Sequence, residues 1–143
     1  MIPRRTSDKK RATSASVRKL ARLAVDGILE KKGHDTVVLD VHSVSGVADI
    51  FIVTTGDSDL QVKAIVESVR STIRENEGER PWHVEGTDHM QWVLLDYVDL
   101  VVHVFLPEKR QFYDLERLWG DAPRAEVPDD APSSEGISLI AGD

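Results

Sequence analysis

The sequence predicts an α/β domain in which helices pack against a mixed sheet of about five strands. Two observations carry this prediction. Segments with helical apolar spacing alternate with short runs of valine, isoleucine and leucine, the pattern of layered α/β folds. The run Leu100–Phe105 is apolar at every position except His103, so this strand must be covered on both of its faces.

Two long helices are predicted. The first runs from Ser16 to near Gly33, which we expect to be the left-handed residue that ends it. Its apolar residues recur every three or four positions and share one face: Val17, Leu20, Ala21, Ala24 and Ile28. The second runs from Ser58 to about Asn76, because Ser58 and Gln61 have the spacing of a capping box and Gly78 provides a stop.

Short β-rich segments predict the strands. Thr36–Val41 and Ala48–Thr55 follow the first helix, and Pro81–Glu85 follows the second. Next comes a hairpin, in which Trp92–Leu95 and Leu100–Phe105 are joined by a polar turn.

A last helical region is predicted after Pro107, which can occupy the first turn of a helix. Phe112, Leu115 and Trp119 are helically spaced, and Gly120 closes the segment.

Charge is distributed unevenly along the chain and suggests three regions. Residues 1–15 are predicted to be a disordered basic arm, 16–120 the folded domain, and 121–143 a disordered acidic tail. The formal charge of the whole chain is −7, and the central domain is acidic. An acidic domain argues against extensive contact with nucleic acid and suits a basic protein partner.

Compartment and cofactor chemistry are constrained by what the sequence lacks. It has no signal-peptide pattern, no apolar run of membrane-spanning length, and no cysteine. Disulfides and cysteine-ligated metals are therefore excluded, and we expect a cytoplasmic location.

The sequence offers carboxylates for catalysis but favours a protein without enzymatic activity. Asp40, Asp49 and Asp59 are the carboxylates that a metal-dependent, nucleotidyltransferase-like enzyme would use. Helix capping explains Ser58 and Asp59 without a ligand, and no Walker A, G-x-S-x-G or G-x-G-x-x-G motif is present. We therefore expect no enzymatic activity, no metal and no cofactor.

Trp92 and His103 each admit two interpretations. Trp92 shares a strand face with Leu94 and Asp96, and suits either an interface anchor or a core residue beneath a helix. His103 is expected to be partly buried, as a satisfied core histidine or as part of a binding surface.

Several blocks of the sequence resemble the ribosomal silencing factor family, also called the Iojap-like family. These are ADIFIVTTGDS at 48–58, HVEG at 83–86, WVLLDYVDLVVHVF at 92–105 and FYDLERLWGDAP at 112–123. They occur in the family's order and span most of residues 16–123.

The resemblance implies both a fold and a function. Members have a mixed five-stranded sheet with nucleotidyltransferase-like topology but without the catalytic residues. They bind protein fourteen of the large ribosomal subunit, block joining of the small subunit and slow translation when nutrients are limiting; free members are often homodimers. Carried over by position, the partner-binding residues are Trp92, Leu94, Leu95, Asp96, Tyr97, Asp99 and His103.

The sequence departs from the family pattern at Val98, where many relatives have glycine. A β-branched residue at positive φ is costly. We therefore expect a wider turn here, or one with negative φ at Val98.

Overall fold

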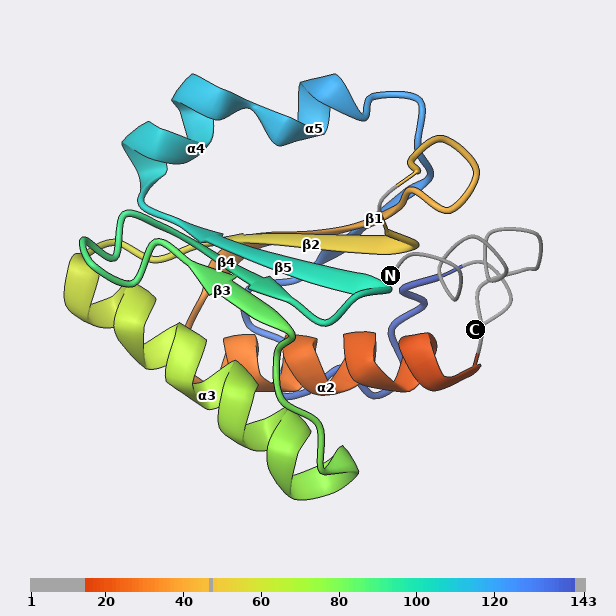
Figure 1. Ribbon diagram of the computed structural model, residues 1–143, viewed down its shortest axis with the longest axis horizontal. Helices are drawn as coiled ribbons and strands as arrows, with labels where there is room; N and C mark the ends of the chain where they lie inside the picture. The colour runs from red at the N-terminus through yellow and green to blue at the C-terminus, as the bar shows by residue number, and fades with distance from the viewer. Residues whose placement is uncertain (1–14, 47, 141–143) are drawn as a thin grey trace.

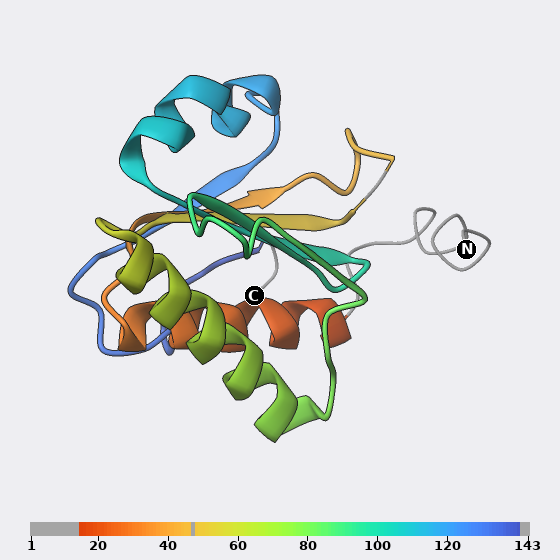
Figure 2. The same cartoon turned by 60° about the vertical axis from the view of Figure 1, so that its left-hand side comes forward.

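The computed structural model describes residues 15–46 and 48–140 and shows three layers. Two helices cover one face of a central sheet, and two shorter helices cover the other (Figures 1 and 2). The helices, in chain order, are α2 (Ala15–Glu30), α3 (Asp59–Glu77), α4 (Pro107–Tyr113) and α5 (Leu115–Leu118). The α/β class predicted from the sequence is confirmed.

The described residues form a mixed sheet of six strands rather than five, in the order β3-β4-β5-β2-β1-β6. Strands β2 and β5 are parallel, and the other neighbouring pairs are antiparallel. The strands are β1 (His34–Asp40), β2 (Ile50–Thr55), β3 (His83–Glu85), β4 (Trp92–Asp96), β5 (Leu100–Phe105) and β6 (Arg124–Val127).

Strand β5 is buried at all six positions, as its apolar sequence predicted. Alternate side chains enter two separate cores, because successive residues of a strand point to opposite faces. Leu100, Val102 and Val104 join the core under α2 and α3. Val101 and Phe105 join the smaller core under α4 and α5.

Helices α2 and α3 pack closely because Gly27 has no side chain. A Cβ atom there would lie 2.9 Å from the Cα of Val69 on α3. The hydroxyl of Ser68 donates a buried hydrogen bond of 2.8 Å to the carbonyl of Gly27. The predicted apolar face of α3 is buried.

The predicted caps of the long helices are largely confirmed. The Ser58 hydroxyl accepts from the backbone N–H of Gln61, and Gly78 ends α3 in the left-handed region. The Gln61 side chain reaches back to the N–H of Asp57. The predicted end of α2 was misplaced: the helix stops at Glu30, and the left-handed residue is Lys32 (φ 65°).

The predicted last helical region is interrupted. Asp114 adopts φ 47° and separates α4 from α5, so two short helices replace one. Together they form the second helical layer, although no residue of α5 is fully buried.

The expectation of a disordered acidic tail is wrong for residues 121–140. Strand β6 pairs with β1, and the segment after it returns to α2. There the guanidinium of Arg22 donates to the carbonyls of Ser134 and Ile137, and Leu139 and Ile140 are buried in the core. The predicted basic arm lies outside the described residues, except for Ala15, which begins α2.

The hairpin turn also differs from expectation, because Val98 adopts φ 79°. The Asp96 carboxylate accepts from the N–H of Val98, and the N–H of Asp99 donates to the carbonyl of Tyr97. These two hydrogen bonds hold a tight turn around a residue that disfavours it. The turn keeps the tight form that glycine would favour, and strain is stored at Val98.

Relief of this strain is the first testable prediction. Val98→Gly should stabilise the protein by about 1 kcal/mol, because a strain of about 1–3 kcal/mol outweighs the entropic cost of glycine. The thermal midpoint should rise by about 3 °C. The matched control is Val44→Gly in another turn, where φ is not positive and stability should fall. A lower midpoint for Val98→Gly would contradict the strained turn.

The packed C-terminal segment gives a second prediction. Leu139 is only 4% exposed, so Leu139→Ala should lower the free energy of unfolding by about 2–4 kcal/mol. Leu118→Ala, at a residue that is 67% exposed, should change it by no more than about 0.5 kcal/mol. Urea unfolding measures both, and equal effects would mean that the segment is not packed as described.

Candidate functional site

The hairpin residues predicted to bind a partner divide into a surface set and a core set. Trp92, Leu94 and Asp96 are half-buried and share one face of β4. Leu95 and Tyr97 point to the opposite face and are buried in the core under α2 and α3. Both are therefore structural residues, which corrects their assignment as contact residues.

The loop before β4 fixes the position of Trp92. Gly86 adopts φ 90°, and a Cβ atom there would lie 1.9 Å from the carbonyl oxygen of Trp92. Only glycine allows the chain to approach the start of β4 this closely. The N–H of Met90 closes the loop on the carbonyl of Gly86 at 3.1 Å.

Trp92 is the centre of an aromatic cluster. Its ring stacks on Phe105 with a centroid separation of 5.0 Å. The ring of Tyr113 on α4 also contacts it, with a centroid separation of 4.4 Å and an interplanar angle of 41°. The structure therefore combines the two interpretations of Trp92, which is packed beneath a helix and yet lies at the surface.

His103 is buried beside Trp92 and Phe105 on the same face of the sheet and cannot contact a partner directly. It is 4% exposed, and its Nδ1 accepts a hydrogen bond of 3.2 Å from the indole Nε1–H of Trp92. Burial lowers the pKa of His103 to about 4, so the ring is neutral near pH 7. Its Nε2 has no partner among the described residues.

The turn end of the hairpin has different chemistry. Burial raises the pKa of Tyr97 to about 12, so its phenol remains protonated. The carboxylate of Asp96 is engaged with the N–H of Val98, and Asp99 is half-buried beside it. At this end of the hairpin, the Asp96 carboxylate and the buried Tyr97 side chain therefore stabilise the turn.

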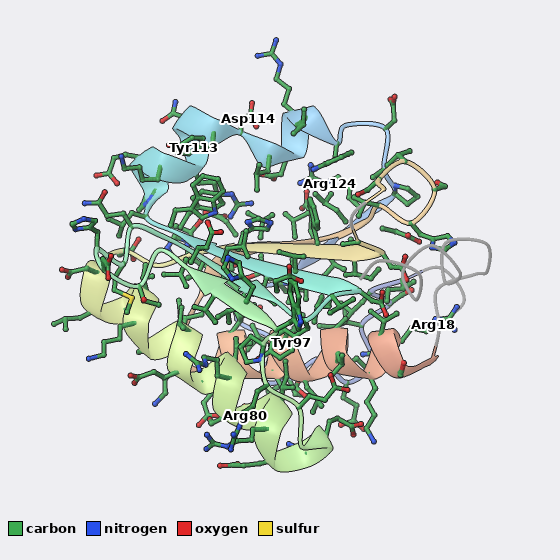
Figure 3. All side chains as sticks on the ribbon, viewed as in Figure 1. Arg18, Arg80, Tyr97, Tyr113, Asp114 and Arg124 are labelled. Atoms are coloured by element: carbon green, nitrogen blue, oxygen red, sulfur yellow. The ribbon has the colours of Figure 1, made fainter. Side chains whose placement is uncertain are left out.

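The sequence interpretation missed Tyr113 as a site residue. Tyr113 is 45% exposed and stands on α4 above the sheet (Figure 3). The available signal was its place beside Phe112 in a helical segment, which gave no indication that it would meet Trp92. That contact joins residues 21 positions apart and depends on how α4 crosses the sheet.

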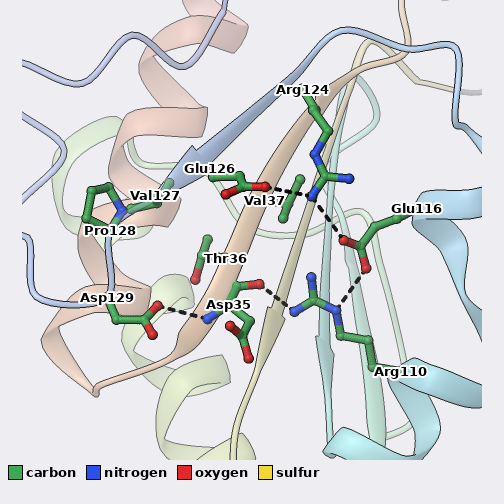
Figure 4. Close-up of a pocket in the computed structure, with 10 residues that line it drawn as sticks. All are labelled: Asp35, Thr36, Val37, Arg110, Glu116, Arg124, Glu126, Val127, Pro128 and Asp129. Atoms are coloured by element: carbon green, nitrogen blue, oxygen red, sulfur yellow. Dashed lines mark hydrogen bonds and ion pairs between the residues drawn. The ribbon is translucent and has the colours of Figure 1, made fainter.

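A polar cleft of about 680 Å³ separates α4–α5 from the edge formed by β1 and β6 (Figure 4). Arg110 of α4 contacts Glu116 at 3.0 Å, and Glu116 also contacts Arg124 of β6. Arg110 donates in addition to the carbonyl of Asp35 and the hydroxyl of Thr55. These interactions attach the small helical layer to the sheet.

The candidate catalytic carboxylates do not converge. Asp40 and Asp49 lie near one end of β2, whereas Asp59 follows its other end. The six residues of β2 span about 17 Å at about 3.3 Å per residue. Asp49 is buried and holds the His42 ring at 2.9 Å. This arrangement does not form the metal site considered from the sequence.

Within the described ranges, one group brings three potential ligand atoms within 4.8 Å of each other: His34, Asp35 and Asp129. Burial alone would lower the pKa of His34, but its hydrogen bonds to Asp57 and Asp35 outweigh burial and raise that pKa. Both ring nitrogens are thus engaged by carboxylates.

Burial of His103 predicts a pH effect on stability. Its folded-state pKa of about 4 lies below the ordinary value of 6.5, so the unfolded chain binds more protons between these values. Stability should therefore fall as the pH drops, and His103 should contribute a loss of about 2 kcal/mol between pH 7 and pH 5.

Urea unfolding at the two pH values tests this. His103→Asn should remove the part of the stability loss between pH 7 and pH 5 that is due to His103. His89→Asn, at an exposed histidine, should show the same difference in unfolding free energy between the two pH values as the wild type. The prediction fails if both variants lose as much stability as the wild type.

No helix in the described part of the chain has the length and apolar character needed to cross a membrane.

Comparison with known proteins identifies the family. The sequence profile described as "Ribosomal silencing factor during starvation" matches residues 14–138. The ribosomal silencing factor RsfS of Bacillus subtilis is 43% identical over 112 residues, covering 78% of this chain and 92% of that protein. The chloroplastic protein Iojap of Zea mays is 38% identical over 104 residues, covering 71% and 43%.

Solved structures show the same fold. A crystal structure of protein CV0518 from Chromobacterium violaceum superimposes with a TM-score of 0.70 at 36% identity. The match covers 81% of this chain and 97% of that one. The chain therefore belongs to the ribosomal silencing factor family.

Proposed function

We propose that this protein represses translation by binding the large ribosomal subunit and blocking its association with the small subunit. The observation that carries the proposal is the family match across residues 14–138, which covers nearly all of the described fold. A mouse relative, 27% identical over 99 residues, is named "Mitochondrial assembly of ribosomal large subunit protein 1", which also points to the large subunit.

The partner we propose on that subunit is its protein fourteen, at the surface where the small subunit docks. The contact surface is the exposed side of β4, formed by Trp92, Leu94 and Asp96 and extended by Asp99 at the turn. An acidic protein with an aromatic and aliphatic patch suits a basic ribosomal partner, since charge speeds encounter and apolar burial stabilises the complex.

Repression of this kind requires binding and bulk, and no chemical step. The sheet is covered on both faces, so β4 presents its outer side chains from a rigid support. A rigid surface loses little conformational entropy on binding. The separation of Asp40 and Asp49 from Asp59 also favours binding over metal-dependent catalysis.

We further propose that the free protein is a homodimer, as the resemblance to the family implied, and that it is cytoplasmic, as expected from the sequence. If the β4 surface serves both the dimer and the ribosome, the two associations compete. Low protein concentration then favours the ribosome-bound form, because dimerisation depends on protein concentration more steeply.

A subunit-joining assay tests the proposed function. Purified large subunits are incubated with the protein before small subunits are added, and the mixture is separated on a sucrose gradient. We expect the peak of intact ribosomes to shrink and that of free subunits to grow, because the bound protein occupies the joining surface.

The matched control is Leu94→Arg, which places a positive charge on the proposed contact surface. This variant should permit joining while keeping its thermal midpoint near that of the wild type, because Leu94 is only half-buried. An unchanged ribosome peak with saturating wild-type protein would refute the proposal.

A further inference from the structure

We infer that Tyr113 of α4 is a principal contact residue of the partner-binding surface, and that Trp92 and His103 act mainly by holding it in place. The inference rests on the proposed binding to the large subunit and names a residue of that same site. In this inference Tyr113 contacts the partner, Trp92 packs against Tyr113, and the buried His103 orients Trp92.

The three side chains contact one another in a series, here called the column, that runs from His103 to Trp92 on the sheet and then to Tyr113 on α4. His103 lies at its base and is 4% exposed. Its Nδ1 accepts the indole N–H of Trp92 at 3.2 Å, and the indole ring meets Tyr113 at 4.4 Å. Tyr113 is 45% exposed, so the outer end of the column reaches solvent.

The contacts of Trp92 leave less of its surface for a partner than the sequence suggested. Its ring stacks on Phe105 at 5.0 Å and contacts Tyr113 at 4.4 Å, and its polar N–H donates to His103. A tryptophan held on these sides supports the tyrosine above it. The outward aromatic area at this place therefore belongs largely to Tyr113.

Helix α4 is too short to hold Tyr113 by its own stability, because isolated helices of its seven residues do not persist in water. Arg110, three residues earlier, supplies the attachment. Its guanidinium contacts Glu116 at 3.0 Å and the hydroxyl of Thr55 on β2 at 2.8 Å (Figure 4). The sheet thus fixes the helix that carries Tyr113.

The base of the column requires a neutral histidine. An Nδ1 atom accepts the indole N–H only when it carries no proton. His103 faces aromatic rings, including Phe51 at 5.2 Å, and its burial favours the neutral form. The hydrogen bond then fixes the rotation of the indole, and with it the support on which Tyr113 rests.

Tyrosine suits a protein surface as its target. It offers a large ring with two side-chain torsions and a hydroxyl for hydrogen bonding, so it loses little entropy when bound. The ring of Tyr113 lies against Trp92, which places it at the Trp92 end of the proposed contact surface on β4. The expected occupant is therefore the large-subunit protein named above.

Binding to isolated large subunits, measured by co-sedimentation, tests the role of Tyr113. Tyr113→Ala should weaken binding at least tenfold, the order of loss at an aromatic hot spot. Its thermal midpoint should fall by only a few degrees, because Tyr113 is 45% exposed and belongs to neither core. Tyr113→Phe keeps the aromatic ring, so its binding to large subunits should weaken much less. Leu60→Ala is the control, since Leu60 is 75% exposed on α3 at the opposite face of the sheet.

The supporting role of His103 has its own readout. His103→Asn retains an acceptor near Nδ1 and should preserve both binding and the indole N–H resonance of Trp92, whereas His103→Leu should shift that resonance and weaken binding. In the Tyr113→Ala background, His103→Leu should add little further loss of binding, because the two residues act through one column.

The outcomes separate this inference from the proposed function. Wild-type protein that binds, together with Tyr113→Ala that binds equally well, overturns the inference and leaves the proposed function intact. The inference is also overturned if Leu60→Ala weakens binding to large subunits as much as Tyr113→Ala does. Wild-type protein that fails to bind overturns the proposed function and this inference with it.

Discussion

The structure depends on the burial of β5 on both faces. A strand with apolar side chains on both faces must be covered by a layer of structure on each side. The two layers in this protein differ in size. The α2–α3 layer is extensive, whereas α4 and α5 together are short and leave the outer face of β4, with Trp92, Leu94 and Asp96, partly open to solvent. The open part is where a surface with aromatic and aliphatic character remains.

Stability and recognition therefore share residues in this protein. Phe105 belongs to the smaller core and also supports Trp92, and Trp92 supports Tyr113. Aromatic rings suit this double role, because one face can pack inward while an edge or hydroxyl remains at the surface. The hydrogen bonds of Arg110 to Asp35 and Thr55 extend the same principle, since they join the sheet to the helix that presents the contact residue.

Long-range pairing explains where sequence patterns were insufficient. Strand β6 contains arginine, alanine, glutamate and valine, which has no strong β pattern, and it exists because β1 offers an unpaired edge. The tight turn at Val98 persists despite its positive φ, because the register of β4 and β5 and the Asp96 carboxylate hold it. The pairing of β6 with β1 and the strained turn at Val98 cannot be predicted from the local amino-acid sequence, because both depend on how the strands pair in the folded sheet.

The sequence by itself determined the α/β class, both long helices, the central hairpin and the burial of β5, because helical and strand periodicities record which side chains are buried. Its signature blocks were also sufficient to indicate the family. Only the tertiary structure decided which hairpin residues face outward, and it placed Leu95, Tyr97 and His103 inside. It alone brought Tyr113 onto Trp92 and returned the C-terminal segment to α2, because such contacts depend on the packing of segments far apart in the chain.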